Sequence, residues 1–273
     1  MLSTSHSTNW EELPTRIWEF YLRLDDIDGY RAYTSSETKC PKDWACKRWA
    51  KPNDMSEQSV LEKLKVGVRK FQVEVHAKNT EHYQRAASTP QMPHTLIIAC
   101  ADSRVDVEAI TSSGPGEIFV SRNIGNMVPP YGGAMGGVTA VIEYAVTALK
   151  VKHVVVCGHS DCGAMKALLH PESTDKMPTV KRWLHNGHAA LMVADSLVHK
   201  DDRPGEQLRG LTEENVLMQL VHLMTHPSVA GAMARGELTT SGWVYDIGTG
   251  VVRIAEGGQR EFVPVTAARG AEG

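Results

Sequence analysis

Hydrophobic residues change their spacing along the chain, and these changes indicate where helices and strands lie. Between residues 56 and 76 apolar side chains recur every three or four positions, which predicts an amphipathic helix. Short continuous apolar runs at 95–100, 117–121 and 153–157 are typical of strands that are buried on both faces. Between the last two runs, residues 136–150 carry apolar side chains at helical spacing. The pattern therefore alternates strand and helix.

This alternation predicts an α/β fold with a central, mostly parallel β-sheet of four to five strands flanked by helices. Residues 181–235 read mainly as amphipathic helices. Two final apolar runs, 242–247 and 251–254, flank Gly248-Thr-Gly250 and predict a hairpin at the edge of the sheet. The helix predicted over residues 56–76 precedes the first strand.

Composition divides the chain into two unequal parts. Four of the six tryptophans precede residue 55, in a stretch without a sustained apolar period. We expect residues 1–54 to be a poorly ordered N-terminal extension of unknown role and residues 55–273 to be the functional domain. The net charge of −3 gives no reason to expect nucleic acid as a partner. No apolar run approaches the roughly 20 residues of a membrane span, and the start lacks a secretory signal, so we expect a cytoplasmic protein without a membrane partner.

Candidate metal ligands follow two of the predicted strands. The first strand ends in Cys100-Ala-Asp-Ser-Arg104, and the third continues into Cys157-Gly-His-Ser-Asp-Cys-Gly163. Adjacent parallel strands would bring Cys100, His159 and Cys162 together at the carboxyl edge of the sheet. Two thiolates and an imidazole suit tetrahedral Zn²⁺, and three protein ligands leave a fourth position for chemistry. The spacing therefore predicts a catalytic zinc site.

Simpler interpretations apply to other cysteines. Five cysteines in 273 residues do not indicate a disulfide framework. Cys157 would be a small core residue that points away from the metal. Cys40 and Cys46 match no common zinc spacing and have no histidine close by, so we interpret them as idle thiols.

Several longer motifs resemble the β-class carbonic anhydrases, and the resemblance runs from about residue 56 to residue 265. Besides the two cysteine motifs, it rests on Gly116-Glu-Ile-Phe-Val-Ser-Arg-Asn-Ile-Gly-Asn-Met-Val-Pro-Pro130, Ile142-Glu-Tyr-Ala-Val146, Glu213-Glu-Asn-Val216, Thr225-His-Pro227 and Gly242-Trp-Val-Tyr-Asp246. Residues 1–54 have no counterpart in it.

The resemblance implies reversible hydration of CO2 to bicarbonate and a proton by a zinc-bound hydroxide. It assigns Asp102 as the acceptor of a hydrogen bond from that hydroxide and Arg104 as the residue that holds Asp102. In a closed state of the family, the aspartate becomes the fourth zinc ligand. The resemblance also implies contacts of substrate with Gln91 and an apolar pocket at Phe119, Ile124 and Tyr144.

In the family the glutamine, phenylalanine and tyrosine come from the neighbouring subunit, so we expect a dimer or tetramer. The resemblance also implies that residues 56–86 form an N-terminal helical arm that wraps the partner. Some members have an allosteric bicarbonate site built on a tryptophan, an arginine and a tyrosine. Here Ile97 replaces the tryptophan, although Arg122 and Tyr245 match the other two positions. We therefore expect the plant-type branch, without strong bicarbonate inhibition.

Two alternatives remain open at this stage. Zinc hydrolases that act on carbonyl sulfide or carbon disulfide resemble the same family. A non-catalytic zinc protein of the same fold is the other alternative, but a purely structural site would need neither Asp102, Arg104 nor Gln91.

Overall fold

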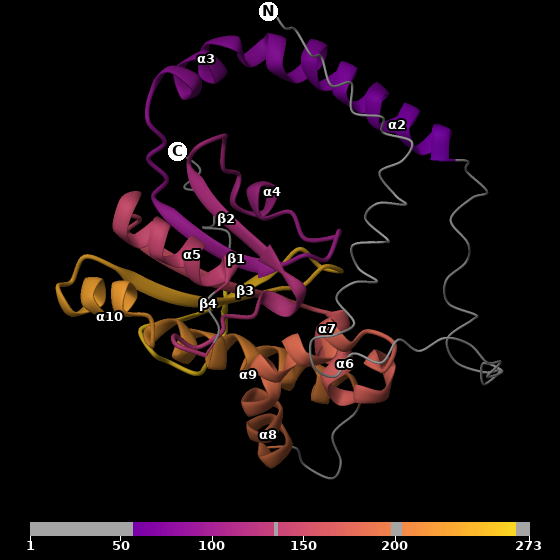
Figure 1. The fold of residues 1–273 in the computed structure, drawn as a ribbon, viewed down its shortest axis with the longest axis vertical. Helices are drawn as coiled ribbons and strands as arrows, with labels where there is room; N and C mark the ends of the chain where they lie inside the picture. The colour runs from indigo at the N-terminus through magenta and orange to yellow at the C-terminus, as the bar shows by residue number, and fades with distance from the viewer. Residues whose placement is uncertain (1–56, 134–135, 198–203, 266–273) are drawn as a thin grey trace, which may run out of the picture. The chain divides into compact units, whose positions relative to one another are not determined.

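The computed structural model describes residues 57–133, 136–197 and 204–265 (Figure 1). The chain divides into two compact units, Met1–Val68 and Arg69–Gly273. The described part of the first unit is helical, because helix α2 spans Glu57–Lys70. Residues 1–54, with Cys40 and Cys46, lie outside the described residues, so the predicted extension and its boundary at residue 55 stay predictions.

The second unit begins with further helical turns, as the arm prediction requires. A π-helical segment η1 (Phe71–His76), a 3₁₀ turn η2 (Ala77–Asn79) and helix α3 (Thr80–Ser88) follow one another. Apolar side chains on η1 face solvent in the single chain: Val73 is 70% exposed. Phe71 contacts the ring of Tyr83 in α3, with the ring centroids 5.9 Å apart, but the Val73 side chain is left largely uncovered.

A single sheet with the order β2-β1-β3-β4-β5-β6 forms the centre of the second unit, counted over the described residues. Strands β1 (Thr95–Cys100), β2 (Ile118–Asn123), β3 (His153–His159) and β4 (Thr239–Tyr245) are mutually parallel, as predicted. The predicted hairpin is β4 with β5 (Val252–Glu256), and the two-residue β6 (Val263–Pro264) adds a sixth strand by antiparallel pairing with β5.

Alternate residues of the buried strands pack into two different clusters, because successive side chains of a strand point to opposite faces. Leu96 and Ile98 of β1 pack with helix α5 (Gly137–Glu143), the π-helical turn η4 (Tyr144–Ala148), α9 (Pro204–Met224) and α10 (Pro227–Ala234). Ile97 and Ala99 face the other side, where α4 (Val107–Thr111) packs. The helices thus flank both faces, with most of them on one face (Figure 1).

A third cluster surrounds the carboxyl ends of β1 and β3. It includes Cys100 and Cys162 together with apolar side chains of later helices. These helices are α6 (Gly163–Leu169), α7 (Pro178–Trp183), η6 (Leu184–Gly187), α8 (His188–Leu197) and α9. The 3₁₀ turn η5 (Pro171–Thr174) lies between α6 and α7. Among the described helices, none is both long and apolar enough to cross a membrane.

Two buried amides on α9 hold the loop that follows β2. The Nδ2 of Asn215 donates to the carbonyl of Gly125 (3.2 Å), which lies in the 3₁₀ turn η3 (Ile124–Asn126). The Oε1 of Gln219 accepts from the backbone N–H of Val128 (2.8 Å). Buried polar groups of this kind require partners, so each amide fixes the position of the loop beside the carboxyl edge of the sheet.

Candidate metal centre

Three metal-binding side chains converge where β1 and β3 end. Cys100 is the last residue of β1, His159 is the last residue of β3, and Cys162 precedes α6. Their ligand atoms all lie within 4.8 Å of one another. All three side chains are buried, and His159 is fully so. The structure therefore brings together the three residues that were predicted from strand adjacency.

Hydrogen bonding selects the tautomer of His159. Its Nδ1 lies 2.9 Å from the carbonyl oxygen of Ser160, and a carbonyl can only accept, so Nδ1 carries the proton. Its Nε2 is buried and makes no hydrogen bond with the described residues. A buried nitrogen with a free lone pair, oriented through the other ring nitrogen, has the usual arrangement of a metal-binding histidine.

The two thiols lie close enough to shift each other's pKa. The interaction with Cys162 lowers the pKa of Cys100, and the same interaction together with burial raises the pKa of Cys162. A dication between the two sulfurs would favour both thiolates. Cys157 differs, because it packs against the opposite face of the sheet and burial raises its pKa to about 12. Its place in the core agrees with its interpretation as a packing residue.

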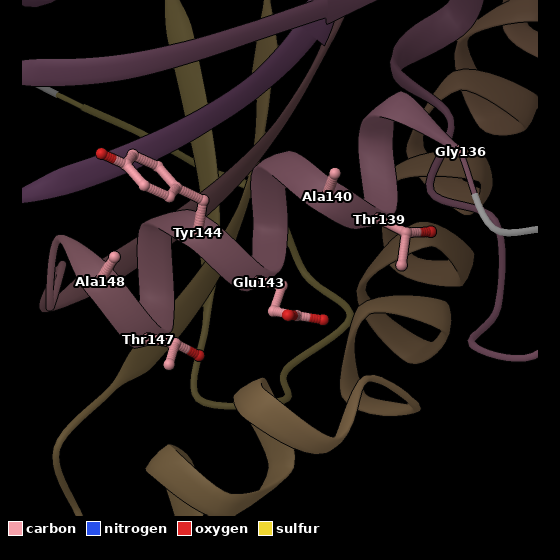
Figure 2. A pocket seen from close by; sticks show the side chains of 7 residues that line it. All are labelled: Gly136, Thr139, Ala140, Glu143, Tyr144, Thr147 and Ala148. Carbon is pink, nitrogen blue, oxygen red and sulfur yellow. The ribbon is translucent and has the colours of Figure 1, made fainter.

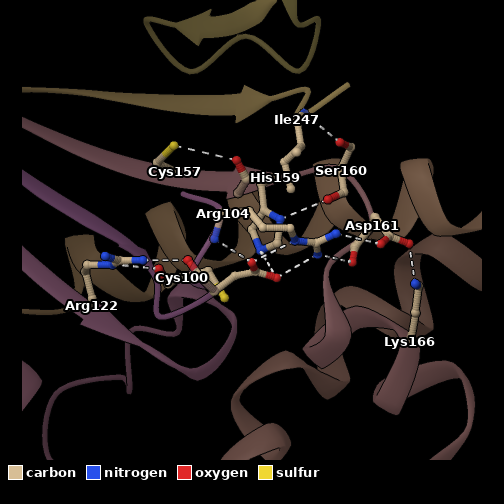
Figure 3. A network of polar contacts seen from close by, with 11 residues as sticks. Cys100, Arg104, Arg122, Cys157, His159, Ser160, Asp161, Lys166 and Ile247 are labelled. Atoms are coloured by element: carbon tan, nitrogen blue, oxygen red, sulfur yellow. Dashed lines mark hydrogen bonds and ion pairs between the residues drawn. The ribbon is translucent and has the colours of Figure 1, made fainter. Parts of the chain in front are cut away.

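A carboxylate held by a guanidinium lies next to the ligand group. Figure 3 shows this guanidinium, of Arg104, beside Cys100 and His159. The Nε and Nη2 of Arg104 donate to Oδ1 and Oδ2 of Asp102 at 2.9 and 2.8 Å, and the backbone N–H of Arg104 donates to Oδ1 at 3.0 Å. These hydrogen bonds hold the pKa of Asp102 well below its usual range. The Oδ2 of Asp102 is 4.0 Å from Nε2 of His159. An ionised carboxylate is therefore fixed next to the ligand group.

Three further charged residues surround this pair, and sequence reasoning did not assign them there. Arg122 of β2 donates to the carbonyl oxygens of Cys100 (3.0 Å) and Asp102 (2.6 Å). Asp161 accepts from Nη1 of Arg104 at 3.0 Å, and Lys166 of α6 forms a short ion pair with Asp161. Only the position of Asp161 inside the His-x-x-Cys segment could have suggested its proximity to the site.

The residues expected at the substrate pocket do not gather around the ligands within one chain. The rings of Phe119 and Tyr144 lie 6.1 Å apart, and Tyr144 is half exposed beside a shallow cavity of about 520 Å³ along α5 and η4 (Figure 2). Gln91 is exposed and precedes β1, whereas Cys100 ends that strand. Five residue steps of β-strand span roughly 17 Å, so Gln91 lies near the opposite edge of the sheet from the ligands. Ile124, by contrast, follows β2 at the ligand edge.

The fold and the site together define an α/β protein in which two cysteines and one histidine, at the carboxyl edge of the parallel strands, could hold a metal ion. An ionised Asp–Arg pair lies next to that group. Such an arrangement leaves a coordination position for chemistry, as catalytic metal sites do.

Comparison with known proteins gives the same assignment. The carbonic anhydrase family model matches residues 95–252. The carbonic anhydrase of Pseudomonas aeruginosa PAO1 is 45% identical over 197 residues, which are 72% of this chain and 88% of the relative. The solved β-carbonic anhydrase CcaA is 37% identical with a TM-score of 0.72, covering 77% of this chain and 93% of that one. A tetrameric β-carbonic anhydrase of Sordaria macrospora is 31% identical with a TM-score of 0.60, covering 72% and 96%. The chain belongs to the carbonic anhydrase family, in its β class.

Proposed function

We propose that this protein catalyses the zinc-dependent, reversible hydration of CO2 to bicarbonate and a proton. The observation that supports it most directly is the Asp102–Arg104 pair, whose carboxylate lies 4.0 Å from the buried, unpartnered Nε2 of His159. A structural metal site has no use for an ionised carboxylate held beside its ligands. The family and the relatives named above, which are carbonic anhydrases, support the same reaction.

The donor set fits zinc. Two sulfurs and one imidazole nitrogen are the borderline-soft ligands that Zn²⁺ prefers, and Cys100, His159 and Cys162 supply them from buried positions. These residues would hold zinc, and the metal would supply the Lewis acidity that lowers the pKa of a bound water to roughly 7. Asp102 is ionised and accepts hydrogen bonds from Arg104. Its carboxylate can therefore also accept a hydrogen bond from the attacking group and orient that group toward CO2.

We further propose that a second copy of the chain completes each site. Gln91, Phe119 and Tyr144 lie away from the ligand group of their own chain, and Phe71, Val73 and Tyr144 are exposed apolar or aromatic side chains. A partner subunit would bring the first three residues to the ligands, with Ile124 as the apolar residue that the same chain contributes. The tetrameric state named for the Sordaria macrospora relatives supports self-association.

Stopped-flow CO2 hydration, with and without a zinc chelator, tests the reaction. We expect chelator-sensitive hydration in the wild type and a severe loss of kcat in Asp102→Ala with its zinc content retained, because the three ligands remain. Zinc-loaded protein without hydration would refute the proposal. Carbonyl sulfide and carbon disulfide in parallel assays test the alternative hydrolase, which faster turnover of either substrate would favour.

Co-expression of two differently tagged variants tests the shared site. Gln91→Ala and Asp102→Ala are each expected to be poorly active, since each removes a component of every site. A mixed dimer of the two has one doubly defective site and one intact site, so the mixture should recover about a quarter of wild-type activity. No recovery in purified mixed dimers would show that Gln91 and Asp102 act within one chain.

A further inference from the structure

The guanidinium of Arg104 contacts two carboxylates, not one (Figure 3). Its Nε and Nη2 donate to Asp102, while its Nη1 donates to Oδ2 of Asp161 at 3.0 Å. The Nη2 also lies 3.3 Å from the backbone carbonyl oxygen of Asp161. Arginine presents its donors in a rigid planar fork, so hydrogen bonds along two different edges of that plane restrain its rotation.

Asp161 is held for this contact from two directions. Its backbone is left-handed (φ 59°), a conformation that aspartate tolerates better than most residues. Lys166, one turn into α6, forms a short ion pair with the other oxygen of the same carboxylate. The backbone therefore aims Asp161 at Arg104, while Lys166 restrains its carboxylate.

The contact joins the two loops that carry the metal ligands. Asp102 and Arg104 follow β1 and its terminal Cys100, whereas Asp161 lies between His159 and Cys162 after β3. Arg104 is 44% exposed, and a single ion pair at such a position is weakly restrained because solvent screens it. A second carboxylate on the far side of the guanidinium supplies the missing restraint.

We propose that Asp161, supported by Lys166, is a positioning residue that anchors the outer side of Arg104 and so keeps its inner edge on Asp102. This role rests on the proposed function, in which Asp102 orients the reacting group. Asp161 itself would touch neither substrate nor metal. Its contribution would reach the reaction through Arg104 and then Asp102.

Two substitutions separate the carboxylate from the backbone conformation. Asp161→Gly tolerates the positive φ and removes the side chain, and Asp161→Asn keeps an acceptor oxygen but removes the charge. We expect kcat and kcat/KM to fall together, by roughly three- to tenfold in Asp161→Gly and by less in Asp161→Asn, since a charged hydrogen bond is lost. The matched control is Asp175→Asn, which breaks an exposed Asp–Lys pair with Lys181 (2.7 Å) and should leave kcat unchanged.

The decisive readout is the NMR signal of the Arg104 guanidinium in the zinc-loaded protein, assigned by its loss in Arg104→Lys. In the wild type we expect separate, slowly exchanging Nη resonances, because Nη2 is held by Asp102 and Nη1 by Asp161. In Asp161→Gly we expect them to merge as rotation becomes faster. Wild-type kcat in Asp161→Gly, or a lower kcat with unchanged Arg104 resonances, would overturn the positioning role. A wild-type chain that fails to hydrate CO2 would instead refute the proposed function, since the resonances report on Arg104 without turnover.

Discussion

Three glycines, two of them near the metal centre and one before the amino end of β2, allow backbone strain and steric overlap to be measured separately. Gly125, in the turn after β2, has φ 76°, and a Cβ there would lie 2.8 Å from the Cβ of Ala164. Gly116 has φ 89° with open space around it. Gly158 has no positive φ, but its Cβ would meet Cγ2 of Val216 at 2.8 Å. Alanine therefore tests both effects at Gly125, strain alone at Gly116 and overlap alone at Gly158.

The expected costs follow from these contacts. A non-glycine residue in the left-handed region costs about 1–2 kcal/mol, and the smaller entropy of the unfolded chain offsets about 0.4–1 kcal/mol of it. Overpacking costs about 1–3 kcal/mol. At Gly158 the neighbour is Val216, whose β-branched side chain is packed on α9 and has little room to move. We expect Gly116→Ala to lose at most about 1.6 kcal/mol and Gly125→Ala to lose about 1–4.5 kcal/mol.

Thermal unfolding of the zinc-loaded proteins at one protein and zinc concentration measures the differences, since bound metal and association both shift Tm. For a unit of about 200 residues, each kcal/mol changes Tm by about 2–4 °C. Gly125→Ala should therefore unfold roughly 2–18 °C below the wild type. The Tm values of Gly116→Ala and Gly158→Ala should lie between those of the wild type and Gly125→Ala. A Gly125→Ala protein as stable as Gly116→Ala would show that Ala164 yields and that the overlap argument is wrong.

Other substitutions test the site and its surroundings. Arg104→Ala should lower kcat about 100-fold with zinc retained, because a positioning partner of the site is lost; zinc analysis and stopped-flow kinetics measure both, and an unchanged kcat would contradict the role. Cys162→Ala should lose zinc on dialysis whereas Cys157→Ala should keep it, as metal analysis would show. Thr249→Val removes a 2.8 Å bond to Asp246 that lowers the pKa of this carboxyl. The variant should lose up to about 1 kcal/mol at pH 7, and the difference should vanish as acid protonates Asp246, a trend that urea unfolding at several pH values can check.

The strands and the ligand set could be predicted from the sequence because both depend on local patterns. Runs such as 95–100 and 153–157 are continuous apolar segments, and parallel pairing places their carboxyl ends at one edge. The pairing of Ala99 with Cys157 then fixes Cys100 next to the His159 loop. The sixth strand could not be predicted, because β6 has only two residues and gains its pairing entirely from β5.

Contacts between distant charged residues were not predictable in the same way. Arg104 and Asp161 are 57 positions apart, and no sequence pattern around either residue indicates that the two side chains form an ion pair. Arg122 was matched to an allosteric site through the family, yet in the single chain it holds the backbone of Cys100 and Asp102. Such contacts depend on loop conformations, including the left-handed backbone of Asp161, which the sequence alone leaves undetermined.

Helix α9 belongs at once to the sheet core and to the loop beside the ligands. Val216 and Leu223 are fully buried against the strands, while Asn215 and Gln219 of the same helix hold Gly125 and Val128. The loop cannot be released from Gln219 without disturbing a helix on which the core depends. We therefore expect the Val128 amide to belong to the slowest hydrogen-exchange class, which opens only when the sheet itself unfolds. On the same argument, the loop beside the metal centre should unfold together with the sheet and not ahead of it.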